Sequence, residues 1–70
     1  MKGIIIEQYE NVDNPDLRLQ IAFSIAQYTS FSAEQREQVR CFMMEREGYC
    51  RSDFQLYDCE ITGLEERDND

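Results

Sequence analysis

The sequence predicts a small α+β domain in the order strand, helix, helix, strand, with an antiparallel helix hairpin packed on a small antiparallel sheet. Three observations predict it: a β-branched run near the N-terminus, two helix-start signals in the middle, and a period-two segment near the C-terminus. Seventy residues suit one domain. We therefore expect residues 1–64 to form a single compact domain and residues 65–70 to form an acidic, mobile C-terminal tail.

The first predicted element is a strand over residues 2–9, with the sequence KGIIIEQY. Its three consecutive isoleucines are β-branched, which favours extended backbone. They do not alternate with polar residues, a pattern typical of a strand covered on both faces. The polar run ENVDNPD then predicts a turn that ends the strand.

The second predicted element is a helix from Asn14 to about Tyr28. Asn14 is a good N-cap, Pro15 suits the first helical position, and Asp16 is favourable beside the positive end of the helix dipole. On a helical wheel, apolar side chains surround most of this segment: Leu17, Leu19, Ile21, Ala22, Phe23, Ile25 and Ala26. Such a helix requires neighbours on nearly every side.

The third predicted element is a helix that begins after Ser32 and runs to about Glu47. Ser32 and Gln35 have the spacing of a capping box, and Gly48 is a natural helix end. The connection from the preceding helix is short, so the two helices are expected to form an antiparallel hairpin.

The run CFMM in this helix contains more apolar side chains than one packing face can bury. The wheel places Val39, Phe42 and Met43 on the face that meets the first helix. It places Cys41 and Met44 on the opposite side. Two explanations stay open: the second strand or C-terminal segment covers Cys41 and Met44, or a partner chain does.

The last predicted element is a strand over residues 53–62, DFQLYDCEIT. Strict alternation puts two sets on opposite faces: Phe54, Leu56, Asp58 and Glu60 against Tyr57, Cys59 and Ile61. The two strands can pair antiparallel, but a two-stranded sheet is marginal in water. Either a further strand is hidden in the turns, or dimerisation completes the sheet.

The charge balance limits the partners. Fifteen acidic residues and seven basic ones give a formal net charge of −8, and histidine is absent. Such a field disfavours direct contact with nucleic acid or an anionic membrane and favours a protein partner with a basic surface. Solubility alone is the plainer explanation of the charge. No apolar run is long enough for a signal or membrane segment, and an odd number of cysteines fits reduced thiols in a cytoplasmic protein.

No motif indicates catalysis or a cofactor. Cys41, Cys50 and Cys59 lack the close pairs of structural zinc sites, and a Cys50–Cys59 bridge requires the strand end to curl back. A nucleophile would have no histidine base. Asp58 and Glu60 could bind Mg²⁺ or act as an acid–base pair, but a domain this small offers little room for a cleft. We therefore predict a protein that is not an enzyme and that binds no metal or cofactor.

The sequence instead favours a non-enzymatic interaction module. Its carboxylates would occupy a basic, nucleic-acid-binding surface of a partner, as those of small acidic phage or mobile-element anti-defence (anti-CRISPR-like) proteins do. That comparison is by class of protein, not by sequence. The predicted partner-binding residues are Arg36, Glu37, Arg40, Cys41, Met44, Glu47, Asp58 and Glu60. The two arginines either pair internally or anchor a partner carboxylate. The alternative is a small structural or assembly subunit that homodimerises to complete its core.

Overall fold

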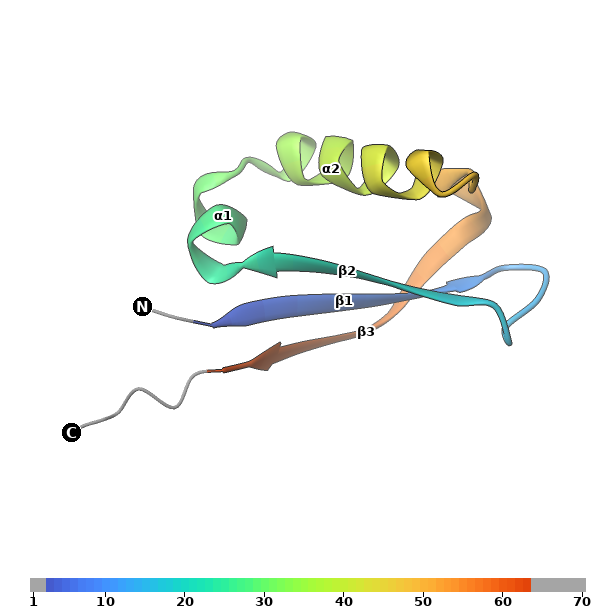
Figure 1. The fold of residues 1–70 in the computed structure, drawn as a ribbon, viewed down its shortest axis with the longest axis horizontal. Helices are drawn as coiled ribbons and strands as arrows, with labels where there is room; N and C mark the ends of the chain where they lie inside the picture. Colours follow the sequence, from blue (N-terminus) through green and yellow to red (C-terminus); the bar gives the residue numbers. More distant parts are fainter. Residues whose placement is uncertain (1–2, 64–70) are drawn as a thin grey trace.

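The computed structural model describes residues 3–63, which form a three-stranded antiparallel sheet with two helices on one face (Figure 1). The elements are β1 (Ile4–Asn11), β2 (Arg18–Ser24), α1 (Ile25–Ser30), α2 (Ala33–Arg46), the 3₁₀ turn η1 (Arg51–Asp53) and β3 (Phe54–Thr62). Strand β1 lies in the centre, between β2 and β3. The α+β class is confirmed, whereas the predicted order is wrong because a second strand precedes the helices. The predicted tail, residues 65–70, lies outside the described residues.

The predicted first helix is wrong, because residues 18–24 form strand β2. This strand pairs antiparallel with β1 along its whole length, for example Ala22 with Ile6. Its side chains alternate between a helix side, with Leu19, Ile21 and Phe23, and the other face, with Arg18, Gln20, Ala22 and Ser24. The sheet thus contains a third strand, so a second copy is not needed to reach three strands.

The residues expected to cap that helix form the β1–β2 hairpin loop instead. The side-chain oxygen of Asn11 accepts hydrogen bonds from the backbone N–H groups of Asp13 and Asn14, both at 2.9 Å. The N–H of Leu17 donates to the carbonyl of Asn14. Asparagine side chains stabilise turns by such local bonds, and here they compete successfully with helix formation.

Both helices begin with a capping box. Ser24 and Gln27 form the one that starts α1, and Ser32 and Gln35 form the predicted one that starts α2. After α2 the chain turns at Gly48, whose φ of 89° lies in the left-handed region that favours glycine. None of the helices in residues 3–63 is long and apolar enough to cross a membrane.

The wheel-based assignment of α2 is wrong in two positions. Met44 is 2% exposed, whereas Phe42 is 65% exposed. The reason is that α2 has no long helix beside it and packs on the sheet through a different face. Met44 joins a core cluster with Tyr9, Ile21, Phe23 and Phe54. Of the two explanations for what covers Met44, the chain itself is therefore the right one.

A β-bulge also overturns the predicted faces of β3. Leu56 pairs with Tyr9, which points toward the helices, whereas Asp58 pairs with Gln8, which points away. Tyr57 is the extra residue between them. One extra residue exchanges the faces of all that follow it, so the helix side of β3 carries Leu56, Cys59 and Ile61 and its outer face carries Asp58 and Glu60.

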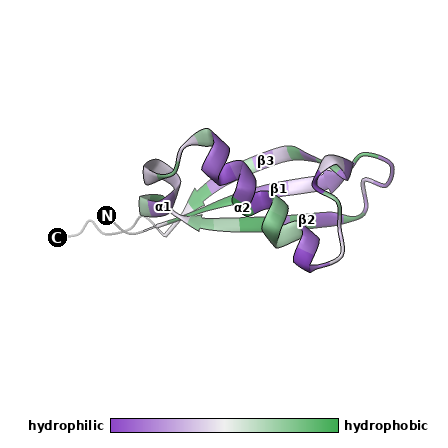
Figure 2. Ribbon diagram, turned by 90° about the horizontal axis from the view of Figure 1, so that it is seen from above, coloured by the Kyte–Doolittle hydropathy of each residue, from purple (hydrophilic) through white to green (hydrophobic). Residues whose placement is uncertain are grey.

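Figure 2 looks down on the sheet from the helix side. Hydrophobic residues are concentrated along β2 and at the start of β1, beneath the helix layer. Strand β3 runs along the other edge, and only Phe54 at its start is buried. The core therefore lies between α2 and two of the three strands.

Candidate functional site

A charged pair lies inside the domain, between β1 and α2. Glu7 is 1% exposed, because the alternation of β1 turns it toward the helices. Arg40 donates to both carboxylate oxygens, from Nε at 2.6 Å and from Nη2 at 2.7 Å. The hydroxyl of Tyr9 donates at 2.8 Å and that of Tyr28 at 3.3 Å. Four hydrogen bonds thus compensate the burial of this carboxylate.

The protonation of this pair follows from its surroundings. Burial alone would raise the pKa of Glu7, but the hydrogen bonds from Arg40 and the two tyrosines outweigh it and hold the pKa below its usual value. Burial and the Glu7 carboxylate raise the pKa of Tyr9. Glu7 and Arg40 are therefore both charged at neutral pH. The pair fastens α2 to the sheet, since Arg40 comes from α2 and Glu7 from β1.

A second ion pair lies on the flank of α2. Glu37 accepts a hydrogen bond from Arg40 Nη1 at 3.2 Å, and its other oxygen lies 2.8 Å from Arg51 Nε. The Nε–H of Arg51 is not directed at that oxygen, but Nη2 of the same guanidinium donates a hydrogen bond to Glu37 Oε1 at 3.4 Å. The Cys41 thiol lies 3.6 Å from Glu37, and burial together with this carboxylate raises the pKa of the thiol. These contacts favour a structural role for the flank.

Arg36 is also used within the fold. Its Nη1 donates to the backbone carbonyls of Tyr28 and Phe31, at 2.7 and 2.8 Å. Its guanidinium lies 4.6 Å from the centre of the Tyr28 ring, a cation–π distance. Arg36 therefore ties α1 to α2, and internal pairing is the role that the structure gives Arg40.

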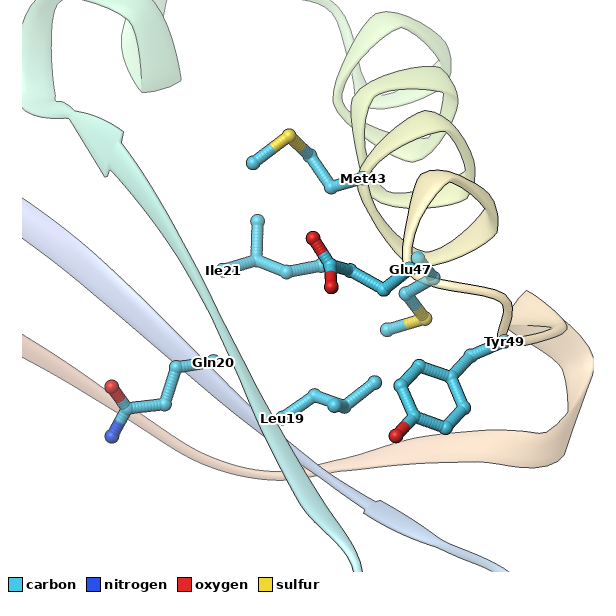
Figure 3. A pocket seen from close by; sticks show the side chains of 7 residues that line it. Leu19, Gln20, Ile21, Met43, Glu47 and Tyr49 are labelled. Atoms are coloured by element: carbon cyan, nitrogen blue, oxygen red, sulfur yellow. The ribbon is translucent and has the colours of Figure 1, made fainter.

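A cavity of about 340 Å³ opens between α2 and β2 (Figure 3). Its walls expose polar and apolar atoms in similar amounts, and Glu47 is its one charged residue; the lining is Leu19, Gln20, Ile21, Met43, Met44, Glu47 and Tyr49. Figure 3 shows Glu47 extending from the end of α2 toward β2, which carries Ile21 on the opposite wall. Glu47 also stands at the C-terminal end of α2, where the helix dipole adds negative potential. Apolar side chains such as Ile21 and Met43 beside a carboxylate suit the stem and charged end of a lysine or arginine.

A second cavity, of about 320 Å³, lies between α2 and the connection from α1. It is lined by Phe31, Gln35, Gln38, Val39 and Phe42. No charged side chain lines it, so it offers nothing that selects a basic partner.

The helix side of β3 is largely uncovered. Leu56 is 50% exposed and Ile61 is 56% exposed, and Cys59 between them is exposed as well. On the outer face, Glu60 accepts a hydrogen bond from the Gln8 side chain at 3.0 Å. An edge strand with one apolar and one acidic side is the result.

The eight predicted partner-binding residues do not form one surface. Three of them, Arg36, Arg40 and Met44, contribute to the interior; Glu37 and Cys41 lie on the flank of α2; Glu47 lines the cavity; Asp58 and Glu60 lie on the outer face of the sheet. Met44 is thus buried and cannot serve as an exposed anchor. Its neighbour Met43, on the cavity wall, is more accessible.

Sequence reasoning missed Glu7 and the cavity residues from β2. A signal for Glu7 existed: in the alternation Ile5, Glu7, Tyr9, the glutamate occupies an apolar face. A carboxylate there demands a buried cation. The cavity had no such signal, because β2 was expected to be helical.

No protein-family model, curated protein or solved structure matches this chain. Within residues 3–63, no group of three or more Cys, Asp or Glu side chains is placed to hold a metal ion. The functional argument therefore depends on the surface of the domain itself.

Proposed function

We propose that this chain is a non-enzymatic, acidic protein–protein interaction module that occupies a basic, nucleic-acid-binding surface of a partner protein. The observation that carries the proposal is an imbalance in charge pairing. In the part of the chain that the structure describes, ion pairs involve only the carboxylates of Glu7 and Glu37. Eight exposed carboxylates have no such partner there: Asp13, Asp16, Glu34, Glu45, Glu47, Asp53, Asp58 and Glu60.

The arginines do little to neutralise this surface. Arg36, Arg40 and Arg51 are half-buried and hold carbonyls or the two paired carboxylates. Arg18 donates to the Pro15 carbonyl and lies over an aromatic ring. These four arginines are engaged in the fold, and Arg46 is exposed on α2. In the described residues the exposed carboxylates therefore outnumber the arginines that could neutralise them, in keeping with the net charge of −8.

The mechanism is occupancy. Lysine and arginine side chains that normally contact phosphates would pair with the exposed carboxylates, so that nucleic acid is excluded from the partner's surface. The cavity beside Glu47 gives one of these side chains a defined place, with its aliphatic stem against Met43 and Ile21. Long-range attraction between surfaces of opposite charge speeds the encounter.

The test is a competition experiment. The purified chain is immobilised and loaded with proteins from its host, and the bound fraction is challenged with duplex DNA and with rising salt. The proposal expects release by DNA and a steep loss of binding as salt rises, because exposed ion pairs are screened within about 3 Å at 1 M salt. A bound fraction that survives about 1 M salt and ignores DNA would contradict it.

A second candidate function is a homodimeric structural or assembly subunit. The uncovered apolar side chains Leu56, Cys59 and Ile61 favour it, because an edge strand with such residues can pair with a copy of itself. Equilibrium sedimentation tests it directly. A monomer at every concentration would exclude this function, and a dimer insensitive to salt would support it.

A further inference from the structure

We propose that the free edge of β3 binds an extended segment of the basic partner as an additional strand, and that this segment alternates apolar residues with lysine or arginine. The inference rests on the proposed function and specifies its mode of recognition. It concerns the sheet edge opposite β2, so it can be tested separately from the Glu47 cavity.

The backbone of β3 provides the first argument. Strand β3 spans Phe54–Thr62, and within residues 3–63 it pairs only with β1. The outer side of an edge strand presents a row of N–H and C=O groups without ladder partners, which is the template for strand addition. Three backbone groups of β3 already have partners. The N–H of Cys59 donates to Asp58 Oδ1 at 2.9 Å, the N–H of Phe54 donates to the carbonyl of Arg51, and the Phe54 carbonyl accepts from Arg51 Nη1 at 2.9 Å. The edge available to a partner strand is therefore the part of β3 beyond Phe54.

The side chains of β3 provide the second argument, because its two faces differ in chemistry. The helix side carries Leu56, Cys59 and Ile61, all exposed, and the outer face carries Asp58 and Glu60. Side chains of a paired strand lie on the same two faces in alternation. A complementary strand must therefore place apolar residues on the helix side and cations on the outer face.

The same carboxylates disfavour a second copy of this chain. Antiparallel pairing of β3 with itself would bring Asp58 and Glu60 of both copies together on one face. Like charges opposite each other on paired strands are destabilising, and each copy also brings a net charge of −8. A strand with lysine or arginine at these positions replaces that repulsion with attraction. The edge therefore selects a basic strand over its own copy.

The experiment titrates the isotope-labelled chain with a short, end-blocked peptide that alternates valine and lysine, followed by amide NMR. We expect the largest shifts and new exchange protection in residues 54–62. A peptide with the same residues arranged in two blocks should bind about tenfold more weakly, since it cannot satisfy both faces. A peptide that alternates valine and glutamate should not bind measurably.

Matched variants separate the edge from net charge. Asp58→Asn with Glu60→Gln keeps the hydrogen-bond acceptors of both side chains but removes their charges. This double variant should bind the valine–lysine peptide about tenfold more weakly. The control, Glu34→Gln with Glu45→Gln, alters exposed carboxylates of α2 by the same net charge and should leave the affinity within about twofold.

Each adverse result has a distinct meaning. One such result is that the alternating and block peptides bind equally, with both double variants weakening them to the same extent. In that case strand addition is wrong, but binding by general charge attraction, on which the proposed function depends, is still supported. If the valine–glutamate peptide binds as well as the valine–lysine one, the basic occupant and the charge-based function are both wrong. If the free chain is dimeric and the amides of residues 54–62 are protected without peptide, a second copy occupies the edge and the inference is overturned.

Discussion

Arg40→Met is expected to destabilise the domain severely, because it leaves a buried carboxylate without its cation. Arg40 supplies two of the four hydrogen bonds to Glu7, at 2.6 and 2.7 Å, and Glu7 has almost no contact with water. Methionine is a good helix former with a long, flexible side chain. The loss should therefore come from the charge and not from helix propensity.

The magnitude follows from the two states open to Glu7. If it stays charged, breaking a buried pair costs about 3–5 kcal/mol. If Glu7 becomes protonated instead, protonating a carboxyl with an ordinary pKa of 4.5 at pH 7 costs about 3.4 kcal/mol. The loss of stability in Arg40→Met is therefore limited to about this value. A 70-residue domain has a total stability of about 3.5–10 kcal/mol, so the variant is expected to be near its unfolding threshold.

Urea denaturation followed by circular dichroism at pH 7 and pH 5 measures this loss. Protonation of Glu7 becomes easier as the pH falls from 7 to 5. The difference in free energy of unfolding between Arg40→Met and the wild type should therefore shrink by about 1.4 kcal/mol per pH unit. The matched control Arg46→Met changes an exposed arginine of the same helix and should stay within about 0.5 kcal/mol. Combining Arg40→Met with Glu7→Gln should recover stability. A loss below about 1 kcal/mol, a loss independent of pH, or no recovery would refute the reasoning.

Three further results are expected. In urea denaturation, Met44→Ala should lower the free energy of unfolding by about 2–5 kcal/mol, because Met44 is buried. Phe42→Ala, at an exposed position, should lower it by less than about 1 kcal/mol. Equal losses would contradict the packing of α2. Glu47→Gln should weaken partner capture more than Glu45→Gln, since only the former lines the cavity; equal weakening would mean that net charge alone matters. Folding lowers the pKa of Glu7. The ionised carboxylate therefore adds to the free energy of unfolding at pH values above its pKa in the unfolded chain, and this contribution is lost as the pH falls through its pKa in the folded domain. In acid titrations, the Glu7→Gln variant should therefore lose less of its free energy of unfolding below about pH 4.5 than the wild type does.

Local sequence patterns predicted some elements and misled at one. The capping box of α2 depends on two residues three apart, and it forms as predicted. The segment from Leu17 to Tyr28 contains β2 and the first part of α1, and its apolar residues fit a strand and a helix almost equally well. Pairing with β1, a tertiary contact, decides for the strand. No local signal could rank the two.

The candidate sites were less predictable, because they depend on how elements meet. The alternation of β1 places Glu7 inward, but only the direction of α2 across the sheet makes Arg40 its partner. The faces of β3 depend on the bulge at Tyr57, and nothing in the neighbouring sequence marks an extra residue there. A strict alternation therefore assigned Asp58 and Glu60 to the wrong side of the strand.

The placement of arginines in the interior of this domain also affects the charge of its surface. The face of α2 that meets the sheet carries Arg36 and Arg40 beside Met44, so hydrogen-bonded cations replace part of an apolar core. Cations used inside are absent outside, which leaves the exposed carboxylates unneutralised. Substitutions of Arg36 and Arg40 should therefore act on folding, and substitutions of the exposed carboxylates should act on binding. The interaction surface can be tested only through the second group, because the first changes the scaffold that presents it.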